Sequence, residues 1–317
     1  MAHTVFIDGH VGTTGLRIHE TLAARDDIEV IAPPEAERKD PSVRAEFLRR
    51  ADLAVLCLPD DAAREAVAAV EDSGTKIVDA STAHRVDAQF AYGLPELSAD
   101  QRERIAGSRH VANPGCYPTS VILALAPLVE DGLLAPDAPI TVHALSGYTG
   151  GGRSMIEKWQ DASSGLVGLP YEAPYAFERQ HKHIPEMMRY AGLAQAPQFL
   201  PAVGPFACGM RVEMPLHAAV LASGTSASRI HELLHTRYAG EPFVRVAAFA
   251  EPFVTEETTL DPQRWNGTNV VELHVAGHPD GHVMLVGLLD NLGKGASGAA
   301  VQNLNLMLGL PEDAGLA

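Results

Sequence analysis

The sequence predicts an α/β fold: a Rossmann-like doubly wound parallel sheet, then an α+β domain with a largely antiparallel sheet. Three observations predict it. Up to about residue 115, short apolar runs alternate with helical patterns, as in a parallel sheet with crossover helices. A glycine-rich turn follows the first apolar run. Beyond residue 140 the apolar runs lengthen, and two of them flank Pro279-Asp280-Gly281, a turn typical of a hairpin.

Residues 1–115 form the first expected domain. Its apolar runs predict buried strands, and the patterns between them have the spacing of amphipathic helices. The expected strands are residues 4–7, 28–32, 52–58, 76–79 and 111–112, and the expected helices are residues 16–22, 41–50 and 60–70. Ligands of such sheets bind at the carboxyl ends of the strands, so the segment after residue 112 should reach the binding edge.

Residues 116–291 form the second expected domain, and a helical pattern follows it. The expected strands are residues 140–145, 212–216, 243–249, 270–275 and 283–287, and the final helix covers residues 292–308. The chain has 317 residues, which is long enough for two domains with cores of their own.

Composition excludes several classes of function. The formal net charge of −16 repels nucleic acid and anionic membranes, and no apolar run approaches membrane-spanning length. The three cysteines are too widely spaced for a disulfide framework, and the start of the chain shows no signal peptide. We therefore expect a cytoplasmic protein without nucleic-acid or membrane partners.

The pattern Gly9-x-x-Gly12-x-x-Gly15 lies between the first expected strand and the first expected helix. Glycines at this spacing permit a tight turn, close approach of a pyrophosphate and close packing of helix on strand. Thr13 and Thr14 add hydroxyl donors. The placement predicts a dinucleotide site, while a glycine-rich loop without a ligand is the alternative.

The second expected strand ends at Ala32-Pro33 without the acidic residue that binds a ribose 2′-hydroxyl. Arg38 follows a few residues later and can pair with a 2′-phosphate, which favours NADP over NAD. A solvated surface charge run is the alternative for Arg38. Ser81, which opens the loop after the fourth strand, is a further candidate for cofactor contact.

Cys116 follows the turn Asn113-Pro114-Gly115 and precedes a long apolar helical run. A thiol at the start of a helix lies among unpaired N–H groups, which favours a nucleophilic thiolate. Cys57 lies inside an apolar strand and fits a buried packing role, and Cys208 remains open between a loop and a packing role.

The cluster His181-Lys182-His183-Ile184-Pro185-Glu186 is the best source of a base for this thiol. His181 and His183 are two residues apart and face the same side if the stretch is extended. Glu186 can orient one of them or bind a substrate nitrogen. Either histidine can act as the acid or base.

A second glycine-rich loop, Ser146 to Arg153, follows an expected strand. Its backbone N–H groups at Gly150 and Gly151 can hold the nicotinamide end of a cofactor or a substrate phosphate, with Arg153 adding charge. A flexible connector is the alternative. Small residues from Gly293 onward permit close packing of the last helix against another helix or a cofactor.

His274, His278 and His282 recur every four residues, a spacing that binds metal when it lies on a helix. The turn at Pro279-Asp280-Gly281 argues against a helix there. We read these histidines as surface residues of a hairpin and expect no metal.

These motifs together resemble the N-acetyl-γ-glutamyl-phosphate reductases of the shorter type, within the semialdehyde dehydrogenase group. The motifs that carry the resemblance are Asn113-Pro114-Gly115-Cys116-Tyr117-Pro118-Thr119, His181-x-His183-x-Pro185-Glu186, the loop 146–153, and the tail 293–299 with Gln302-Asn303. Ser120 departs from the family, which usually has Gly or Ala there.

The resemblance implies NADPH-dependent reduction of N-acetyl-glutamyl 5-phosphate to N-acetyl-glutamate 5-semialdehyde in arginine biosynthesis, through a thioester on Cys116. It also implies that residues 292–317 complete the NADP-binding domain and that the protein is a homodimer or homotetramer. Arg153, Arg179 or Arg211 would bind the phosphate or α-carboxylate of this small acyl-phosphate substrate.

Two rival functions remain. One is a sister enzyme with the same mechanism, an aspartate-semialdehyde dehydrogenase or a reductase of a carrier-bound or aminoadipyl substrate. The other is a non-catalytic NADP-binding regulator, against which the intact Cys116, His181, His183 and Glu186 argue.

Overall fold

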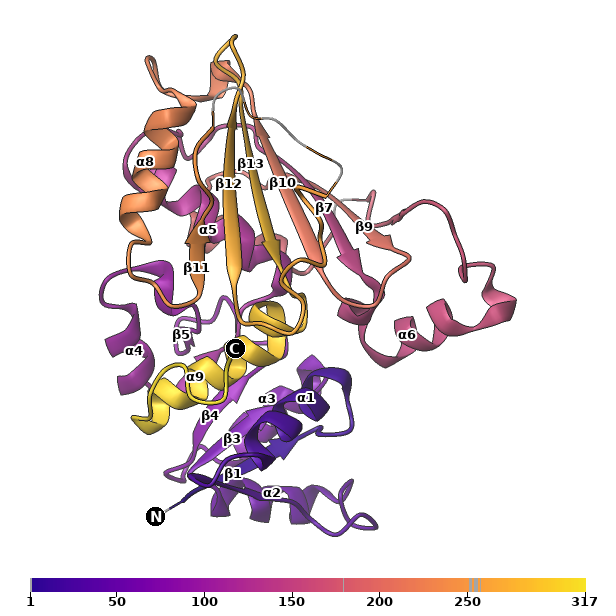
Figure 1. Ribbon diagram of the computed structural model, residues 1–317. Helices are drawn as coiled ribbons and strands as arrows, with labels where there is room; N and C mark the ends of the chain where they lie inside the picture. Colours follow the sequence, from indigo (N-terminus) through magenta and orange to yellow (C-terminus); the bar gives the residue numbers. More distant parts are fainter. Residues whose placement is uncertain (1, 179, 251–252, 254–255, 257) are drawn as a thin grey trace. The chain divides into compact units, whose positions relative to one another are not determined.

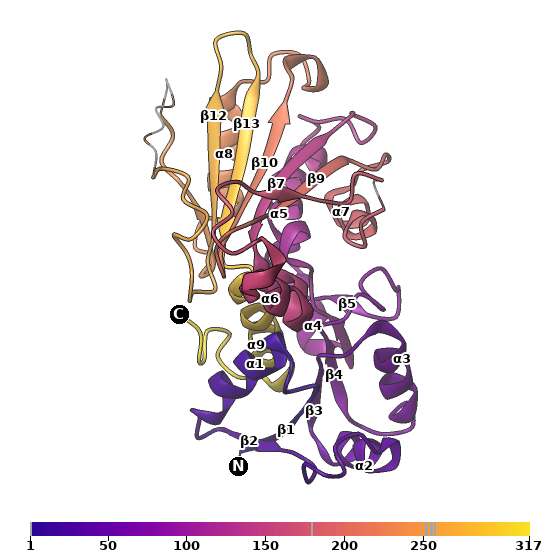
Figure 2. The same ribbon diagram turned by 90° about the vertical axis from the view of Figure 1, so that its right-hand side faces the viewer.

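The computed structural model describes residues 2–178, 180–250, 253, 256 and 258–317. The chain forms two compact units (Figures 1 and 2). The first unit comprises residues 1–114 and 296–317, and the second comprises residues 115–295. Among the described helices, none combines the length and the apolar character that crossing a bilayer requires.

The first unit contains a six-stranded sheet in the order β2-β1-β3-β4-β6-β5, and every pair in it is parallel. Its strands are β1 (His3–Asp8), β2 (Ile28–Ile31), β3 (Leu53–Leu56), β4 (Lys76–Asp79), β5 (Ala91–Tyr92) and β6 (His110–Ala112). Its helices are α1 (Thr13–Ala23), α2 (Pro41–Arg50), α3 (Asp60–Ala69), α4 (Gln101–Gly107) and α9 (Gly298–Leu308), with a 3₁₀ turn η1 (Pro95–Leu97). The predicted parallel sheet is confirmed.

Helices cover both faces of this sheet because its strands are apolar on both sides. Val5 and Ile7 of β1 point into a core that contains Ile18 of α1 and Leu304 of α9. The intervening Phe6 points to the opposite core, formed with α2 and α3. The two-residue period of a strand therefore separates two hydrophobic cores within one unit.

The last helix, α9, packs within the first unit, beside α1 and α4 (Figure 1). About one turn of it carries three fully buried amide side chains, at Gln302, Asn303 and Asn305. Buried amides need hydrogen-bond partners. The side chain of Gln302 donates to Glu96, and that of Asn305 donates to the carbonyl of Ala314.

The second unit contains a seven-stranded mixed sheet in the order β11-β12-β13-β10-β7-β9-β8. Its strands are β7 (Thr141–Gly147), β8 (Ala173–Pro174), β9 (Gln198–Gly204), β10 (Met210–Leu216), β11 (Val244–Val246), β12 (Val271–Gly277) and β13 (Val283–Leu289). Its α-helices are α5 (Cys116–Glu130), α6 (Gly152–Gln160), α7 (Ile184–Ala191) and α8 (Ala227–Arg237), with 3₁₀ turns η2 (Tyr148–Gly151), η3 (Ala162–Ser164) and η4 (Ala218–Val220). Four of its six strand pairs are antiparallel, as the largely antiparallel prediction requires.

Helix α5 is buried along almost its whole length, against β10, β12 and β13 and beside α7 and α8. Pro127 lies inside this helix and has no N–H for the carbonyl of Leu123. The hydroxyl of Tyr238, which follows α8, donates to that carbonyl at 2.6 Å. The proline is thus tolerated because a side chain replaces the missing donor.

Several elements differ from the sequence prediction. Strand β11 is shorter than the expected 243–249, and the expected helix 292–308 begins with a π-helical turn at Gly293–Ser297. Strand β6 is the last strand of the first sheet along the chain, as predicted, and the two-residue β5, which the sequence did not predict, lies outside it. The sequence analysis also missed α4, α6, α7, α8, β8 and β9, because their polar or proline-containing patterns are weak signals.

Candidate active site

Cys116 is the first residue of α5, as the sequence predicts. Gly115 precedes it in extended conformation and offers no side chain to cap the helix. The first amides of a helix have no partner within the helix, so the thiol lies at the positive end of the α5 dipole.

Gly295 packs directly against Cys116. A Cβ atom at this position would lie 2.8 Å from Cβ of Cys116, closer than real side chains approach. Gly295 belongs to the π-helical turn that also contains the fully buried Lys294. Turns of this kind often occur at functional sites, and this one fixes the space available beside Cys116.

Glu186 lies in the first turn of α7 and is almost completely buried. The backbone N–H of Gly115 donates to its Oε2 at 2.9 Å. The sequence analysis assigned Glu186 to a histidine or to a substrate nitrogen. In the structure this carboxylate also holds the residue before Cys116, and the expected roles stay predictions.

The two histidines of the cluster lie in a turn, not in the extended stretch assumed from the sequence. Their rings are nevertheless neighbours, with centroids 4.7 Å apart and planes nearly perpendicular. The turn brings the backbone N–H of His183 to Nδ1 of His181 at 3.2 Å. The local turn therefore achieves the pairing that strand periodicity was expected to give.

Two tyrosines near this cluster were missed by the sequence analysis. The hydroxyl of Tyr117 lies 3.3 Å from that of Tyr175, which lies 3.4 Å from Nε2 of His181. The Tyr117 ring also packs edge-on against His181, His183 and Phe199. Tyr117 is the neighbour of Cys116 in sequence, but nothing in the sequence brings Tyr175 to it.

Burial raises the pKa of both tyrosines. For Tyr117, burial and then the charges of Tyr175 and Cys116 raise the pKa well above its usual value. For Tyr175, burial raises the pKa to about 12, with the hydrogen bond from Tyr117 opposing and the charge of Cys116 adding to the rise. Both hydroxyls therefore stay protonated at neutral pH.

The predicted substrate arginines lie apart from one another. Arg153 is in the first turn of α6, after the three glycines. Arg211 lies on β10 opposite Leu288, whereas the next pair, Val212 and Gly287, points toward Ser120 of α5. The Arg211 side chain therefore projects to the sheet face away from α5, where its Nε lies 2.8 Å from Glu213. Arg179 lies outside the described residues.

The second glycine-rich loop forms the turn η2 and the start of α6, so it is not a flexible connector. A Cβ at Gly150 would lie 3.2 Å from the Ser146 hydroxyl, and one at Gly151 would meet Met155. The hydroxyl of Thr149 lies 3.4 Å from Sγ of Cys208, which places Cys208 in the packing of this loop.

The first glycine-rich turn joins β1 to α1, as predicted. Gly9 has φ +91°, and a Cβ at Gly15 would lie 2.5 Å from the carbonyl oxygen of Gly9. Helix α1 begins at Thr13 without an acidic residue or a side-chain cap in its first turn. The turn and the helix start thus leave backbone N–H groups for an anion, which fits a pyrophosphate.

The remaining cofactor candidates are held by neighbouring side chains. Nε of Arg38 lies 2.8 Å from the exposed Glu35, an arrangement compatible with the surface charge run weighed above. The hydroxyl of Ser81 donates to Asp79 at 2.8 Å, and Nδ1 of His84 lies 2.6 Å from the same buried carboxylate. Ser81 therefore orders its own loop at the end of β4.

Arg44 was missed by the sequence analysis. It reaches from α2 to the carboxylate of Asp8, at the end of β1, with a shortest distance of 2.7 Å. The residues lie far apart in sequence, so only the parallel sheet brings them together.

The three histidines considered for metal lie on or beside the hairpin β12–β13. His274 is 3.0 Å from Glu272, and Nδ1 of His282 accepts the backbone N–H of Ala218. Within the described part of the chain, no group of three metal-ligating side chains is found.

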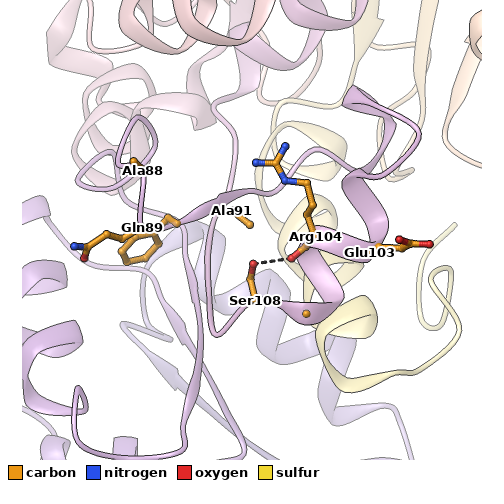
Figure 3. Close-up of a pocket in the computed structure, with 8 residues that line it drawn as sticks. Ala88, Gln89, Ala91, Glu103, Arg104 and Ser108 are labelled. Carbon is orange, nitrogen blue, oxygen red and sulfur yellow. Dashed lines mark hydrogen bonds between the residues drawn. The ribbon is translucent and has the colours of Figure 1, made fainter.

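A cavity of about 380 Å³ lies between the β5 region and α4 (Figure 3). The hydroxyl of Ser108 donates to the carbonyl of Arg104 at its wall. The cavity contains none of the predicted site residues. Its lining residues are Ala88, Gln89, Phe90, Ala91, Glu103, Arg104, Gly107 and Ser108.

Comparison with known proteins gives the family. Residues 24–105 match the semialdehyde dehydrogenase NAD binding domain, and residues 116–291 match the semialdehyde dehydrogenase dimerisation domain. N-acetyl-gamma-glutamyl-phosphate reductase 2 of Nostoc sp. is 48% identical, over 98% of this chain and 98% of that protein. The chain belongs to the N-acetyl-gamma-glutamyl-phosphate reductase family. The Brucella anthropi reductase is 49% identical, over 98% of this chain and 99% of its own length.

Solved structures agree with the fold of this reductase-family chain. Aspartate semialdehyde dehydrogenase II of Vibrio cholerae superimposes with a TM-score of 0.70 at 17% identity, over 97% of this chain and 98% of that one. The Candida albicans aspartate semialdehyde dehydrogenase with NADP gives a TM-score of 0.64 at 14% identity, over 97% of this chain and 99% of that one. At these identities the likeness concerns the fold alone.

Proposed function

We propose that this chain catalyses the NADPH-dependent reduction of N-acetyl-L-glutamyl 5-phosphate to N-acetyl-L-glutamate 5-semialdehyde and phosphate. This is a step of arginine biosynthesis, and its place is the cytoplasm. The observation that carries the proposal is the 48% identity to a named reductase along nearly the entire length of both chains. Cys116 at the start of α5 supplies the nucleophile that such a reaction needs.

The first half of the reaction is an acyl transfer. Sγ of Cys116, as thiolate, attacks the acyl carbon, the bond from that carbon to the phosphate oxygen breaks, and phosphate leaves with the electron pair. The product is a thioester on Cys116. The amides of the first turn of α5 stabilise the thiolate before attack.

The second half is a reduction, and NADPH supplies the hydride for it when bound. His181 or His183 gives a proton to the resulting oxyanion and later takes one back as the carbon–sulfur bond breaks, which frees the aldehyde and the thiolate. Glu186 holds the turn from which Cys116 reacts. The two ring neighbours share the acid–base role in this proposal.

We assign cofactor binding to the first unit. Gly9, Gly12 and Gly15 admit the pyrophosphate, with Thr13 and Thr14 as hydroxyl donors at the start of α1. Arg38 would release Glu35 to bind a 2′-phosphate.

Three further residues are assigned to cofactor contact. Ser81 would contact the cofactor through its ordered loop. Gly150 and Gly151 would contact the cofactor through their backbone N–H groups. Cofactor titrations of single variants test each of these residues separately.

Arg153 is the arginine that we assign to the phosphate or carboxylate of the substrate. It lies at the start of α6, where the helix end also favours an anion. Arg211 is already paired with Glu213 on the sheet face away from α5. We expect Arg153→Ala to raise KM for the acyl phosphate by about tenfold, whereas Arg211→Ala leaves KM within about twofold.

We also propose that the protein is a homodimer or a homotetramer, assembled through the domain formed by residues 116–291. The match of this segment to a dimerisation domain supports the proposal. The exposed Met284 points to the sheet face away from α5 and is a candidate contact. Light scattering during size-exclusion chromatography tests it, and a monomeric mass at micromolar concentration would refute it.

An aspartate-semialdehyde dehydrogenase is the rival function within the same fold. The reverse reaction separates the two, because it uses a stable aldehyde together with phosphate and NADP⁺. We expect formation of reduced cofactor with N-acetylglutamate semialdehyde and at least about a hundredfold less with aspartate semialdehyde. The opposite preference would assign the chain to the rival function, and an absence of reaction with either would point to a non-catalytic regulator.

Cys116→Ala tests the covalent step in the same assay. We expect loss of activity by at least about 10⁴-fold, because no thioester can form. Cys208→Ala is the matched control, since this thiol packs beside Thr149 and has no part in the proposed chemistry. Substantial activity in Cys116→Ala would refute the thioester.

A further inference from the structure

Tyr175 links two groups of the proposed active site. It follows β8, and its backbone N–H donates to the carbonyl of Pro201 at 3.0 Å, which anchors the residue to β9. Its hydroxyl lies 3.4 Å from Nε2 of His181 and 3.3 Å from the hydroxyl of Tyr117. A single oxygen thus joins the catalytic histidine pair to the residue that follows Cys116.

The direction of the hydrogen bonds at His181 follows from the backbone N–H of His183, because this group can only donate. The backbone N–H of His183 donates to Nδ1 of His181 at 3.2 Å, so this nitrogen must be unprotonated. The neutral His181 ring therefore carries its proton on Nε2 and donates to Tyr175. The hydroxyl of Tyr175 also shares a hydrogen bond with that of Tyr117, in which either oxygen can donate.

Burial makes the orientation specific. Tyr117 is 4% exposed, and its ring packs edge-on against both histidines. In such a site a ring flip of His181 would set Nε2 against the N–H of His183 and Nδ1 against Tyr175, and both hydrogen bonds would have to re-form.

We propose that Tyr175 is a positioning residue for the reaction, whose hydroxyl accepts the Nε2 proton of His181 and holds that ring in place within the histidine pair. This role rests on the proposed function, because it acts through a histidine of that site. Tyr175 contacts neither substrate nor cofactor in the proposal. The N–H of His183 decides which nitrogen of His181 carries the proton, and the Tyr175 hydroxyl accepts from that nitrogen.

The test is Tyr175→Phe, with Tyr171→Phe as the matched control. Tyr171 lies four residues earlier in the same segment and is 63% exposed, so its hydroxyl has no such role. For Tyr175→Phe we expect kcat to fall about tenfold, a fraction of what acid–base catalysis contributes, with KM changed by less than about twofold. Tyr171→Phe should leave both constants unchanged.

The pH profile of kcat distinguishes this role from a structural one. A charged imidazolium gains more from an acceptor at Nε2 than a neutral ring does, so loss of the hydroxyl should move the histidine limb to lower pH. Tyr117→Phe should cause a similar loss. In the double variant Tyr117→Phe/Tyr175→Phe the two losses in kcat should not multiply, because both substitutions interrupt the same series of hydrogen bonds.

An unchanged kcat and pH profile in Tyr175→Phe would overturn the proposal, and so would equal losses in Tyr175→Phe and Tyr171→Phe. Multiplying losses in the double variant would also overturn it. Failure of the underlying function is seen separately, as activity that survives in Cys116→Ala. A wild-type melting temperature in Tyr175→Phe shows that the kinetic change does not arise from unfolding.

Discussion

The side-chain amide of Asn303 donates to Oδ1 of Asn113 at 3.1 Å and to the carbonyl of Gly93 at 2.9 Å. Asn113 in turn donates to the carbonyl of Ala296 at 2.9 Å. Helix α9 is thereby fastened to the end of β6, where the segment leading to Cys116 begins. A residue near the end of the chain thus supports the turn that precedes the nucleophile.

Asn303→Ala should destabilise the protein. The substitution leaves the buried groups of Gly93 and Asn113 without a donor, which costs about 1–3 kcal/mol per group. Urea unfolding should therefore show a lower midpoint, while Gln89→Ala, at an exposed position, should leave the midpoint unchanged. Equal midpoints for both variants would contradict the anchoring role of Asn303.

We expect Glu272 to stabilise the folded protein in a way that is lost in acid. Burial alone would raise the pKa of Glu272, but hydrogen bonds from His274 and Trp265, with the charges of His274 and Arg264, hold it at about 2. A pKa that is lower in the folded state than in the unfolded state stabilises the protein above the unfolded value of 4.5. This stability is lost as the pH falls from about 5 toward 2.

Glu272→Gln should therefore flatten the acid limb of the stability curve. At pH 7 we expect the variant to be about 1–2 kcal/mol less stable than the wild type, and the gap should narrow below pH 5 and close only as the pH reaches about 2. Thermal melts across this range measure it. A constant difference at every pH would show that the charge of Glu272 has no part in the effect.

Much of the fold follows from the sequence because its signals are local. The glycine turn at Gly9 and the hairpin turn at Gly281 require positive φ, and both lie where the sequence places them. Buried parallel strands such as β3 are continuous apolar runs that resemble little else. Helix α7 was missed because its eight residues make little more than two turns, which is too short to show the helical period clearly.

The site is less predictable because it depends on contacts between distant segments. Cys116 and the histidine cluster could be recognised from the residues next to them in the sequence. Tyr175 and Gly295 were not singled out, since their roles arise only when β8 and the π-helical turn approach α5. The sequence also gives no sign that Glu186 accepts the backbone N–H of Gly115, because this contact joins two distant segments.

We expect the Cys57 thiol to resist alkylation under conditions in which the Cys116 thiol is alkylated. Burial, together with the charges of Asp79 and Asp8, raises the pKa of the Cys57 thiol to about 12. Thiolate is the reactive form, so iodoacetamide at pH 7 should leave Cys57 unmodified while it alkylates Cys116. Peptide mapping by mass spectrometry after partial inactivation measures the order. Modification of Cys57 in parallel with inactivation would contradict the assignment.

Glu186 offers the sharpest test of how the nucleophile is held. Glu186→Gln keeps an oxygen that can accept the N–H of Gly115, whereas Glu186→Ala leaves that buried donor unpaired. If the carboxylate serves to hold the turn, Glu186→Gln should retain kcat within about tenfold, and Glu186→Ala should lose about a hundredfold or more.

The rate of Cys116 alkylation in the absence of substrate gives the second measurement for Glu186. It should fall in Glu186→Ala and stay near the wild-type rate in Glu186→Gln, because the turn rather than the charge sets the thiol position. Equal large losses in both variants, with alkylation unchanged, would mean that the negative charge itself acts on the substrate or on a histidine. That result would restore the role expected from the sequence, in which Glu186 binds a substrate nitrogen or orients the histidine pair.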